Sequence, residues 1–155
     1  MSEETPETVV KIEDLGYNTF FESKRKELKL EDFSVARVVA EYKEAYRVKN
    51  SNGEYLAKIT GKQMFEAATR EDYPAVGDWV AITELNNEQA VIHKVLPRLT
   101  MIKRKHGDKS KINGKKESQL IAANVDIAFV VESIDRDYNL NRFDRYFTIV
   151  RDGGV

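Results

Sequence analysis

The sequence contains no cysteine, only three prolines and only two histidines. The lack of cysteine excludes both a disulfide framework and a thiolate metal site. His93 and His106 have no second histidine at the short spacing of a metal site, so we expect neither to bind a metal. No apolar run approaches the roughly 20 residues that a membrane span needs, and the acidic opening Met1–Glu4 lacks the features of a secretory signal. These absences predict a cytoplasmic protein without membrane contact.

The length of 155 residues fits one ordinary domain, or a small domain of about 100 residues followed by part of another. Hydrophobic residues make up 41% and charged residues 33% of the chain. This balance is typical of a globular protein with a core and argues against disorder along the whole chain.

Positive charge is concentrated in one segment, although the formal net charge of the chain is only −1. The segment from Arg98 to Lys116 holds eight lysines and arginines against one acidic residue, Asp108, which gives it a local charge of +7. A local positive field of this kind attracts phosphate backbones even when the total charge is balanced. The alternative interpretation is a solvated linker loop.

The pattern of apolar residues predicts a helical start followed by a small barrel. Residues 1–32 show loose helical spacing, and from residue 33 the sequence is rich in β-branched residues. About five short strands are expected, at 35–42, 46–49, 54–60, 78–83 and 89–96, with an Asn52-Gly53 turn and a possible short helix over 63–69. This order favours a five-stranded Greek-key barrel of the oligonucleotide-binding (OB) type, and an SH3-like barrel is the alternative.

The pattern of apolar residues changes again after the basic segment. Val125–Val131 is a nearly continuous apolar run, which is typical of a strand buried on both faces of a parallel sheet. Asn139 is placed to cap a helix in which apolar residues recur from Leu140 to Val150, and Gly153 with Gly154 is expected to end it. The sequence therefore predicts the first β-α unit of an α/β domain.

Four motifs occur in a distinctive order: Pro74-Ala-Val-Gly-Asp-Trp-Val80, Val95-Leu-Pro-Arg98, Gln119-Leu-Ile-Ala-Ala-Asn-Val-Asp126 and Phe143-Asp-Arg-Tyr146. Together they closely resemble the ribosome small subunit-dependent GTPase A family, called RsgA or EngC, from about Leu15 to Val155. The resemblance implies an N-terminal OB barrel, a circularly permuted GTPase domain and a C-terminal zinc-binding domain, acting late in maturation of the 30S ribosomal subunit.

On this resemblance we expect the chain to be the front part of a longer protein. Its expected parts are an N-terminal helical extension (1–32), the OB barrel (33–97), a basic linker (98–119) and the start of a truncated GTPase domain (120–155). GTP, magnesium and zinc are implied for the full-length family member only.

The nucleotide-binding motifs of a GTPase are missing from this sequence. No Asn-Lys-x-Asp motif is present, and Gly61-Lys62 lacks both the preceding glycine and the following hydroxyl residue of a phosphate-binding loop. Without that loop there is nothing to hold the phosphates and the magnesium ion. We therefore expect no catalytic residue, no cofactor and no metal in this chain, and no GTP hydrolysis by it alone.

RNA binding is the function that remains. We expect a monomer that contacts ribosomal RNA of the small subunit through basic side chains on the barrel and in the basic segment. The candidates are Arg37, Arg47, Lys58, Lys62, Arg98, Lys103, Arg104, Lys105, Lys109, Lys111, Lys115 and Lys116. The alternative is a protein-interaction or regulatory barrel, with the basic segment as a flexible tether.

A few other side chains have expected roles. Trp79 is expected to be half-buried in the core, and Tyr42, Tyr46 and Tyr55 are surface candidates for base stacking. Asn124 and Asp126 are expected to bracket a strand start, with Asp126 bonded to backbone amides. The last helix should turn a solvated or domain-facing side outward, made of Arg142, Asp144 and Arg145.

Overall fold

The structure is a computed structural model that describes residues 10–62, 67, 69–105, 111–112, 115–116, 118–136 and 138–155. It begins with a short 3-10 helix η1 (Glu13–Leu15) and the helix α1 (Thr19–Glu27). Asn18 caps α1, because its side-chain oxygen accepts a hydrogen bond of 3.0 Å from the Phe20 amide. The helical start expected from the sequence is confirmed.

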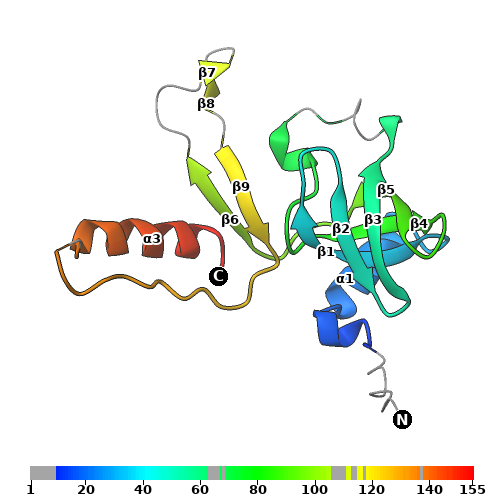
Figure 1. The fold of residues 1–155 in the computed structure, drawn as a ribbon, viewed down its shortest axis with the longest axis horizontal. Helices are drawn as coiled ribbons and strands as arrows, with labels where there is room; N and C mark the ends of the chain where they lie inside the picture. Colours follow the sequence, from blue (N-terminus) through cyan, green and yellow to red (C-terminus); the bar gives the residue numbers. More distant parts are fainter. Residues whose placement is uncertain are drawn as a thin grey trace, which may run out of the picture.

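Five strands close into a barrel next to α1 (Figure 1). They are β1 (Ser34–Glu41), β2 (Tyr46–Asn50), β3 (Gly53–Ile59), β4 (Trp79–Glu84) and β5 (Gln89–Val95). The order around the barrel is β1-β2-β3-β5-β4, and the β3–β5 pairing is parallel while the other pairings are antiparallel. This Greek-key order confirms the OB barrel and decides against the SH3-like alternative.

The predicted tight turn joins β2 to β3. Gly53 has a φ of +154°, which suits a residue without a β-carbon. The Asn50 side-chain oxygen accepts hydrogen bonds from the amides of Asn52 at 2.9 Å and Gly53 at 3.2 Å. Asn50 is buried, and its side-chain nitrogen donates to Glu84 Oε1 on β4 at 2.9 Å. The turn is therefore tied to the strand that closes the barrel.

Two apolar clusters form the core. One fills the barrel and is made by inward-facing residues that include Val38, Val48 and Ile92. The other lies between the barrel and α1, where Trp79 packs against Phe21. Trp79 is fully buried at 0% exposure, so the prediction of a half-buried tryptophan underestimated its burial.

Two of the three tyrosines proposed for base stacking lie inside. Tyr46 and Tyr55 are buried, because strand alternation puts them on the inner face with Val48 and Ala57. The surface assignment was therefore wrong for these two residues. Tyr42, which follows β1, is exposed as predicted.

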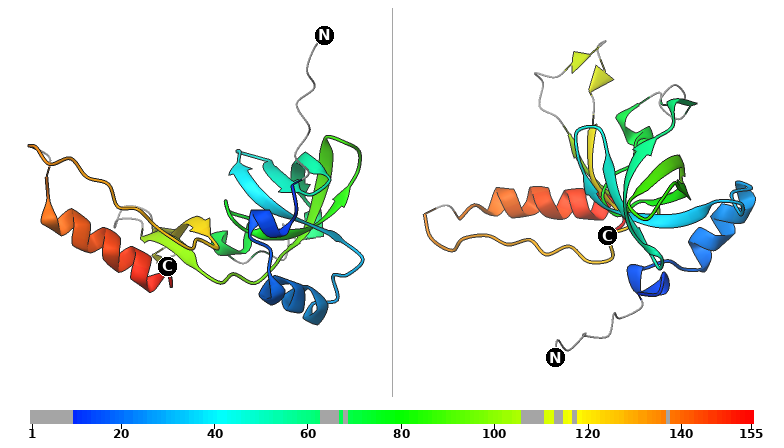
Figure 2. Two further views of the ribbon diagram at one scale, coloured as in Figure 1. Left: turned by 90° about the horizontal axis from the view of Figure 1, so that it is seen from below. Right: turned by 45° about the vertical axis from the view of Figure 1, so that its right-hand side comes forward.

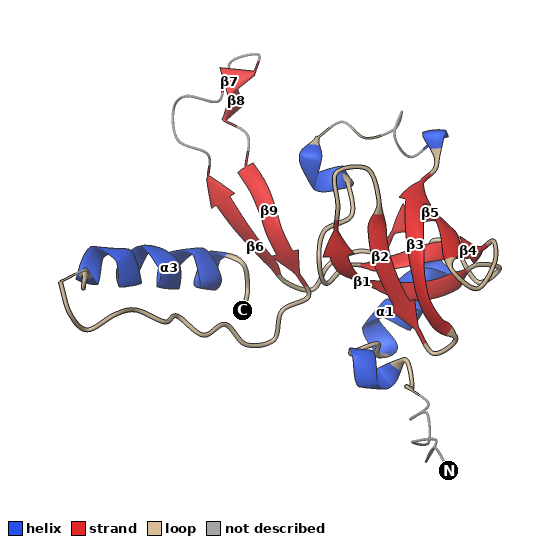
Figure 3. Cartoon of the chain, in the orientation of Figure 1, coloured by secondary structure: helices blue, strands red, loops and turns tan. Residues whose placement is uncertain are grey.

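The basic segment contains strands where the sequence suggested a linker. β6 (Met101–Lys105) pairs antiparallel with β9 (Ser118–Ala123), and β7 (Lys111–Ile112) pairs with β8 (Lys115–Lys116). We call the β6–β9 pair the ladder; it projects away from the barrel, with β7 and β8 beyond its end (Figure 3). The expected short helix over 63–69 falls largely outside the described residues, and a 3-10 helix η2 (Arg70–Asp72) follows it.

The apolar run after β9 is not a strand in this chain. Residues 125–134 belong to no strand, and Phe129 and Val131 are 87% and 88% exposed. The buried strand expected here was wrong for the chain as it stands. A strand of a parallel sheet needs neighbouring strands for its backbone and cover for both faces, and no strand among the described residues pairs with this segment.

The last element is the helix α3 (Leu140–Asp152). As predicted, Asn139 caps it by accepting a hydrogen bond of 3.0 Å from the Asn141 amide, and Gly154 follows its end with a φ of +78°. Among the described residues, no helix is both long enough and apolar enough to cross a bilayer. Figure 2 shows α3 and residues 125–136 extending beside each other on the side away from the barrel.

Candidate nucleic-acid interface

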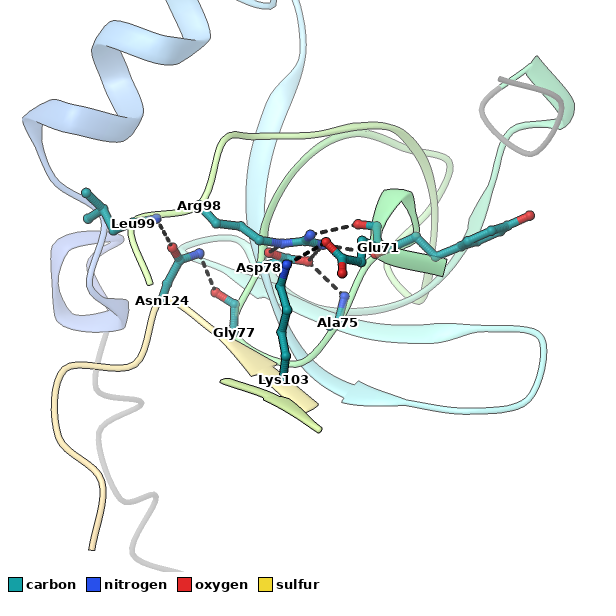
Figure 4. A network of polar contacts seen from close by, with 9 residues as sticks. Glu71, Ala75, Gly77, Asp78, Arg98, Leu99, Lys103 and Asn124 are labelled. Atoms are coloured by element: carbon teal, nitrogen blue, oxygen red, sulfur yellow. Dashed lines mark hydrogen bonds and ion pairs between the residues drawn. The ribbon is translucent and has the colours of Figure 1, made fainter. Parts of the chain in front are cut away.

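A buried ion pair joins the barrel to the chain that leaves it (Figure 4). The Asp78 carboxylate is fully buried. The Arg98 guanidinium donates a hydrogen bond to each of its oxygens, from Nε to Oδ1 at 2.7 Å and from Nη2 to Oδ2 at 2.6 Å. The same guanidinium donates to the carbonyl oxygens of Glu71 and Tyr73 at 2.7 and 3.0 Å. Four hydrogen bonds therefore occupy Arg98, and its planar fork suits this bidentate geometry.

We call the contact between the barrel and the ladder around Asp78 and Arg98 the joint. The turn before β4 places Asp78 in this joint. Asp78 Oδ2 also accepts a hydrogen bond of 2.8 Å from the Ala75 amide. Gly77 has a φ of +93°, and a β-carbon there would lie 2.0 Å from the Ala123 carbonyl oxygen at the end of β9. Only glycine lets the barrel and the ladder approach so closely.

Asn124 completes the joint from the ladder side. Its backbone is left-handed with a φ of +53°, and its side chain is buried. The side-chain oxygen accepts from the Leu99 amide at 2.8 Å, and the side-chain nitrogen donates to the Gly77 carbonyl at 3.0 Å. We expected Asp126 to bond backbone amides here, but Asn124 does this and Asp126 is exposed.

Arg37 of β1 is also a structural residue of this joint. Its guanidinium donates to the carbonyl of Leu15 in η1, and to the carbonyl of Asn124 at 2.9 Å. The group lies over the Trp79 ring at 6.0 Å from the centroid. Of the twelve RNA-binding candidates, Arg37 and Arg98 are thus held by internal carbonyl and carboxylate groups, and neither is carried into the proposed surface.

A second ion pair lies at the solvent edge of the joint. Glu71 of η2 accepts hydrogen bonds from Lys103 Nζ of β6 and from the Ser118 hydroxyl of β9, both at 2.6 Å. The hydrogen bond from Lys103, followed by the one from Ser118, lowers the pKa of the Glu71 carboxyl. The side chains of Lys103 and Glu71 are each 33% exposed, so this pair is open to water.

The remaining described cations of the basic segment lie on or beyond the ladder. Arg104 is exposed on β6, next to Lys105. The backbone register of β7 and β8 pairs Lys111 with Lys116 and Ile112 with Lys115. Lys109 lies outside the described residues.

The barrel candidates lie on its outer face. Arg47 of β2 and Lys58 of β3 are both exposed. Leu56 of β3 is the register partner of Arg47 and comes two residues before Lys58. Glu54 forms ion pairs with Arg47 at 3.7 Å and with Lys49 at 3.0 Å. Lys62 is exposed at the start of the connection that leads to η2.

The side chains that bind Arg98 and Lys103, or that share their partner, were not singled out from the sequence. Asp78 stands in a motif that was read only as a family signature, and Glu71 and Ser118 lie in unremarkable segments. No spacing rule links residues 71, 103 and 118, because only the folded ladder brings them together.

The last helix has its charged residues facing solvent. Arg142 is paired with Glu132 at 2.7 Å. Asp144 and Arg145 are exposed, as expected.

The residues present do not fit GTP, magnesium or zinc. The sequence has no cysteine and no glycine-rich phosphate loop. Within the described ranges, no group of three or more potential metal-ligating residues occurs.

Comparison with known proteins places the chain. No family model matches it. It is 37% identical over 146 residues, 93% of this chain, to "Small ribosomal subunit biogenesis GTPase RsgA" of Syntrophotalea carbinolica. It is also 42% identical over 123 residues, 78% of this chain, to "Small ribosomal subunit biogenesis GTPase RsgA 1" of Oceanobacillus iheyensis. The chain belongs to the RsgA family. It spans 40% and 33% of the lengths of these two relatives.

A solved structure supports the fold assignment. The crystal structure of YjeQ from Thermotoga maritima superposes with a TM-score of 0.52 at 20% identity, covering 77% of this chain and 37% of that one. At this identity the likeness establishes the fold alone. The family resemblance and the OB barrel predicted from the sequence are both confirmed.

Proposed function

We propose that this chain binds RNA of the small ribosomal subunit, as the front part of a GTPase that assists late maturation of that subunit. The observation that carries the proposal is the division of the cations into two groups. Arg37 and Arg98 are held inside the joint, whereas the other cations of the basic segment that the structure describes belong to strands that project from the barrel (Figure 1).

The projecting strands suit a phosphate backbone. The ladder and the β7–β8 pair bring lysines and arginines from separated positions into a narrow, strongly basic element. Cations arranged in this way release counterions when they neutralise phosphates, and this release supplies affinity without base recognition. Arg47, Lys58 and Lys62 of the barrel extend the proposed surface, with Tyr42 as its stacking candidate.

The names of the relatives support the wider role. Both relatives are named as GTPases of small ribosomal subunit biogenesis. We propose the same role for the whole protein of which this chain would be a part, in the cytoplasm and as a monomer. In that protein GTP, magnesium and zinc would be bound by segments beyond the motifs found here, and this chain alone would not hydrolyse GTP.

The salt dependence of RNA affinity tests the proposal. A fluorescently labelled single-stranded RNA of 20 nucleotides would be titrated with the chain between about 50 and 300 mM salt. If about six phosphates are neutralised, log affinity should fall against log salt with a slope near −4. A flat dependence would contradict the proposal.

A second candidate function is a protein-interaction module, and a different region favours it. Ile127 and Ile134 are 69% and 94% exposed in the segment that also exposes Phe129 and Val131. Contiguous exposed apolar side chains of this kind are typical of protein contacts. If this region provides the main contact, Phe129→Ser with Val131→Ser should abolish association with purified small subunits, and the salt dependence should be flat.

A further inference from the structure

The Glu71 carboxylate occupies two hydrogen-bond donors of the ladder. It accepts from Lys103 Nζ and from the Ser118 hydroxyl, each at 2.6 Å, so one oxygen takes a cation and the other takes a neutral donor. Phosphate oxygens in protein–RNA contacts use the same two kinds of donor. We propose that Glu71 is a built-in competitor that keeps Lys103 and Ser118 occupied until RNA displaces it; this inference rests on the proposed function.

The two ion pairs of the joint differ in a way that supports displacement. Asp78 is fully buried and Arg98 is 11% exposed, so removing either partner would leave a charge without water. Glu71 and Lys103 are each 33% exposed, and water can solvate both after separation. Ion pairs with this exposure are weak and are screened by salt, so a polyanion can replace the carboxylate.

The competitor is present under ordinary conditions. Its hydrogen bonds to Lys103 and Ser118 lower the pKa of the Glu71 carboxyl, so this group stays ionised at neutral pH. Glu71 also stays near the ladder when its side chain moves, because its own carbonyl accepts a hydrogen bond of 2.7 Å from Arg98. Release of the side chain therefore does not require η2 to leave the joint.

The connection carrying Glu71 would respond to RNA. Glu71 lies between β3 and β4, in the same connection as Lys62. When a phosphate takes Lys103 and Ser118, η2 keeps the hydrogen bonds that Arg98 donates to the Glu71 and Tyr73 carbonyls but loses its side-chain contact with the ladder.

Glu71→Gln tests the inference, because it removes the charge and keeps the shape. With no carboxylate to displace from Lys103, affinity for the 20-nucleotide RNA should rise about fivefold at 0.1 M salt and the slope should steepen by about 0.7, because the freed carboxylate no longer takes up a cation. In a Lys103→Met background the same change should have no effect on RNA affinity, because the competitor then has no cation to release. Glu13→Gln removes an equal charge from an exposed site on η1 and should change affinity less than twofold, given a screening length of about 10 Å at this salt.

The outcomes separate this inference from the proposed function. If the wild-type chain shows the steep salt slope but Glu71→Gln binds RNA no more tightly, the competitor is excluded and RNA binding stands. If the wild-type chain shows no salt-dependent RNA binding, the proposed function is wrong, and the competitor is judged with inorganic tripolyphosphate instead. The Ser118 amide signal in NMR should then reach half-saturation at a lower tripolyphosphate concentration in Glu71→Gln, and equal concentrations in both chains would overturn the inference.

Discussion

The barrel and the segment after the ladder contain the same kinds of apolar residue but bury them to opposite degrees. Val48 and Ile92 in the barrel are 0% exposed, whereas Phe129 and Val131 are 87% and 88% exposed. The barrel supplies all of its own strand neighbours, since β4 closes onto β1. The comparison shows that an apolar run indicates a surface suited to burial, while the partner that covers it depends on the rest of the fold.

The joint between the barrel and the ladder should be the most sensitive point of the chain. Asp78→Asn would leave the Arg98 guanidinium without its buried counter-charge, which should lower the free energy of unfolding by about 3–5 kcal/mol. Urea unfolding followed by fluorescence of Trp79, the single tryptophan, measures this loss. Glu54→Gln, at an exposed ion pair, should cost less than about 1 kcal/mol; equal losses in the two variants would show that the joint is not special.

A matched pair of isoleucines compares the two regions directly. Ile92→Ala in the barrel should destabilise by about 2–4 kcal/mol, because it leaves a cavity in a closed core. Ile127→Ala, at 69% exposure, should change the same unfolding midpoint by less than about 0.5 kcal/mol. If both substitutions cost the same, the segment after the ladder is packed in solution and the contrast drawn here fails.

A matched pair of glycines tests the closeness of barrel and ladder. Gly77→Ala should cost about 2 kcal/mol, because its φ is positive and the new β-carbon would meet the Ala123 carbonyl. Gly61→Ala is the control, since a β-carbon there meets nothing within 4 Å. Thermal unfolding of the two variants provides the measurement, and a Gly77→Ala chain as stable as wild type would argue against this close contact.

The smallest expected effect is on pH dependence. The pKa of the Glu71 carboxyl is lowered from its usual value of 4.5. Its ion pair therefore stabilises the folded state above that pH, and the contribution is lost as pH falls through the lower, folded-state pKa. Because the side chain is partly exposed, the difference between wild type and Glu71→Gln should be below about 1 kcal/mol at pH 7. The difference should vanish once the pH falls below the lowered, folded-state pKa of Glu71; a difference that grows in acid would have the wrong sign.

Local patterns were enough to predict most of the barrel from the sequence. The Asn52-Gly53 turn, the alternating strands and the Asn139 cap each have a local physical cause that sequence shows directly. The inward orientation of Tyr46 and Tyr55 follows from the same alternation once the strand faces are assigned. Closeness to a turn does not by itself place an aromatic side chain at the surface, so the surface prediction for these two residues was wrong.

The candidate site was harder to predict because its decisive contacts are long-range. In the sequence, Arg98 is the first cation of the basic segment. In the folded chain it pairs with Asp78, which lies twenty residues earlier. Lys103 likewise meets Glu71 only through the ladder. Charge counting located the basic segment, but only the three-dimensional structure separates cations with internal partners from those on the projecting strands.

Charge reversal on the ladder tests the central claim most directly. Lys103→Glu/Arg104→Glu/Lys105→Glu would be compared with Lys11→Glu/Lys26→Glu/Lys29→Glu, which makes the same change in net charge at exposed residues in and around the N-terminal helices. We expect the ladder variant to lose at least about 100-fold in RNA affinity at 0.1 M salt, with a slope shallower by about 2, while the control variant stays within about threefold. Equal losses in the two variants, or none in the ladder variant, would contradict it.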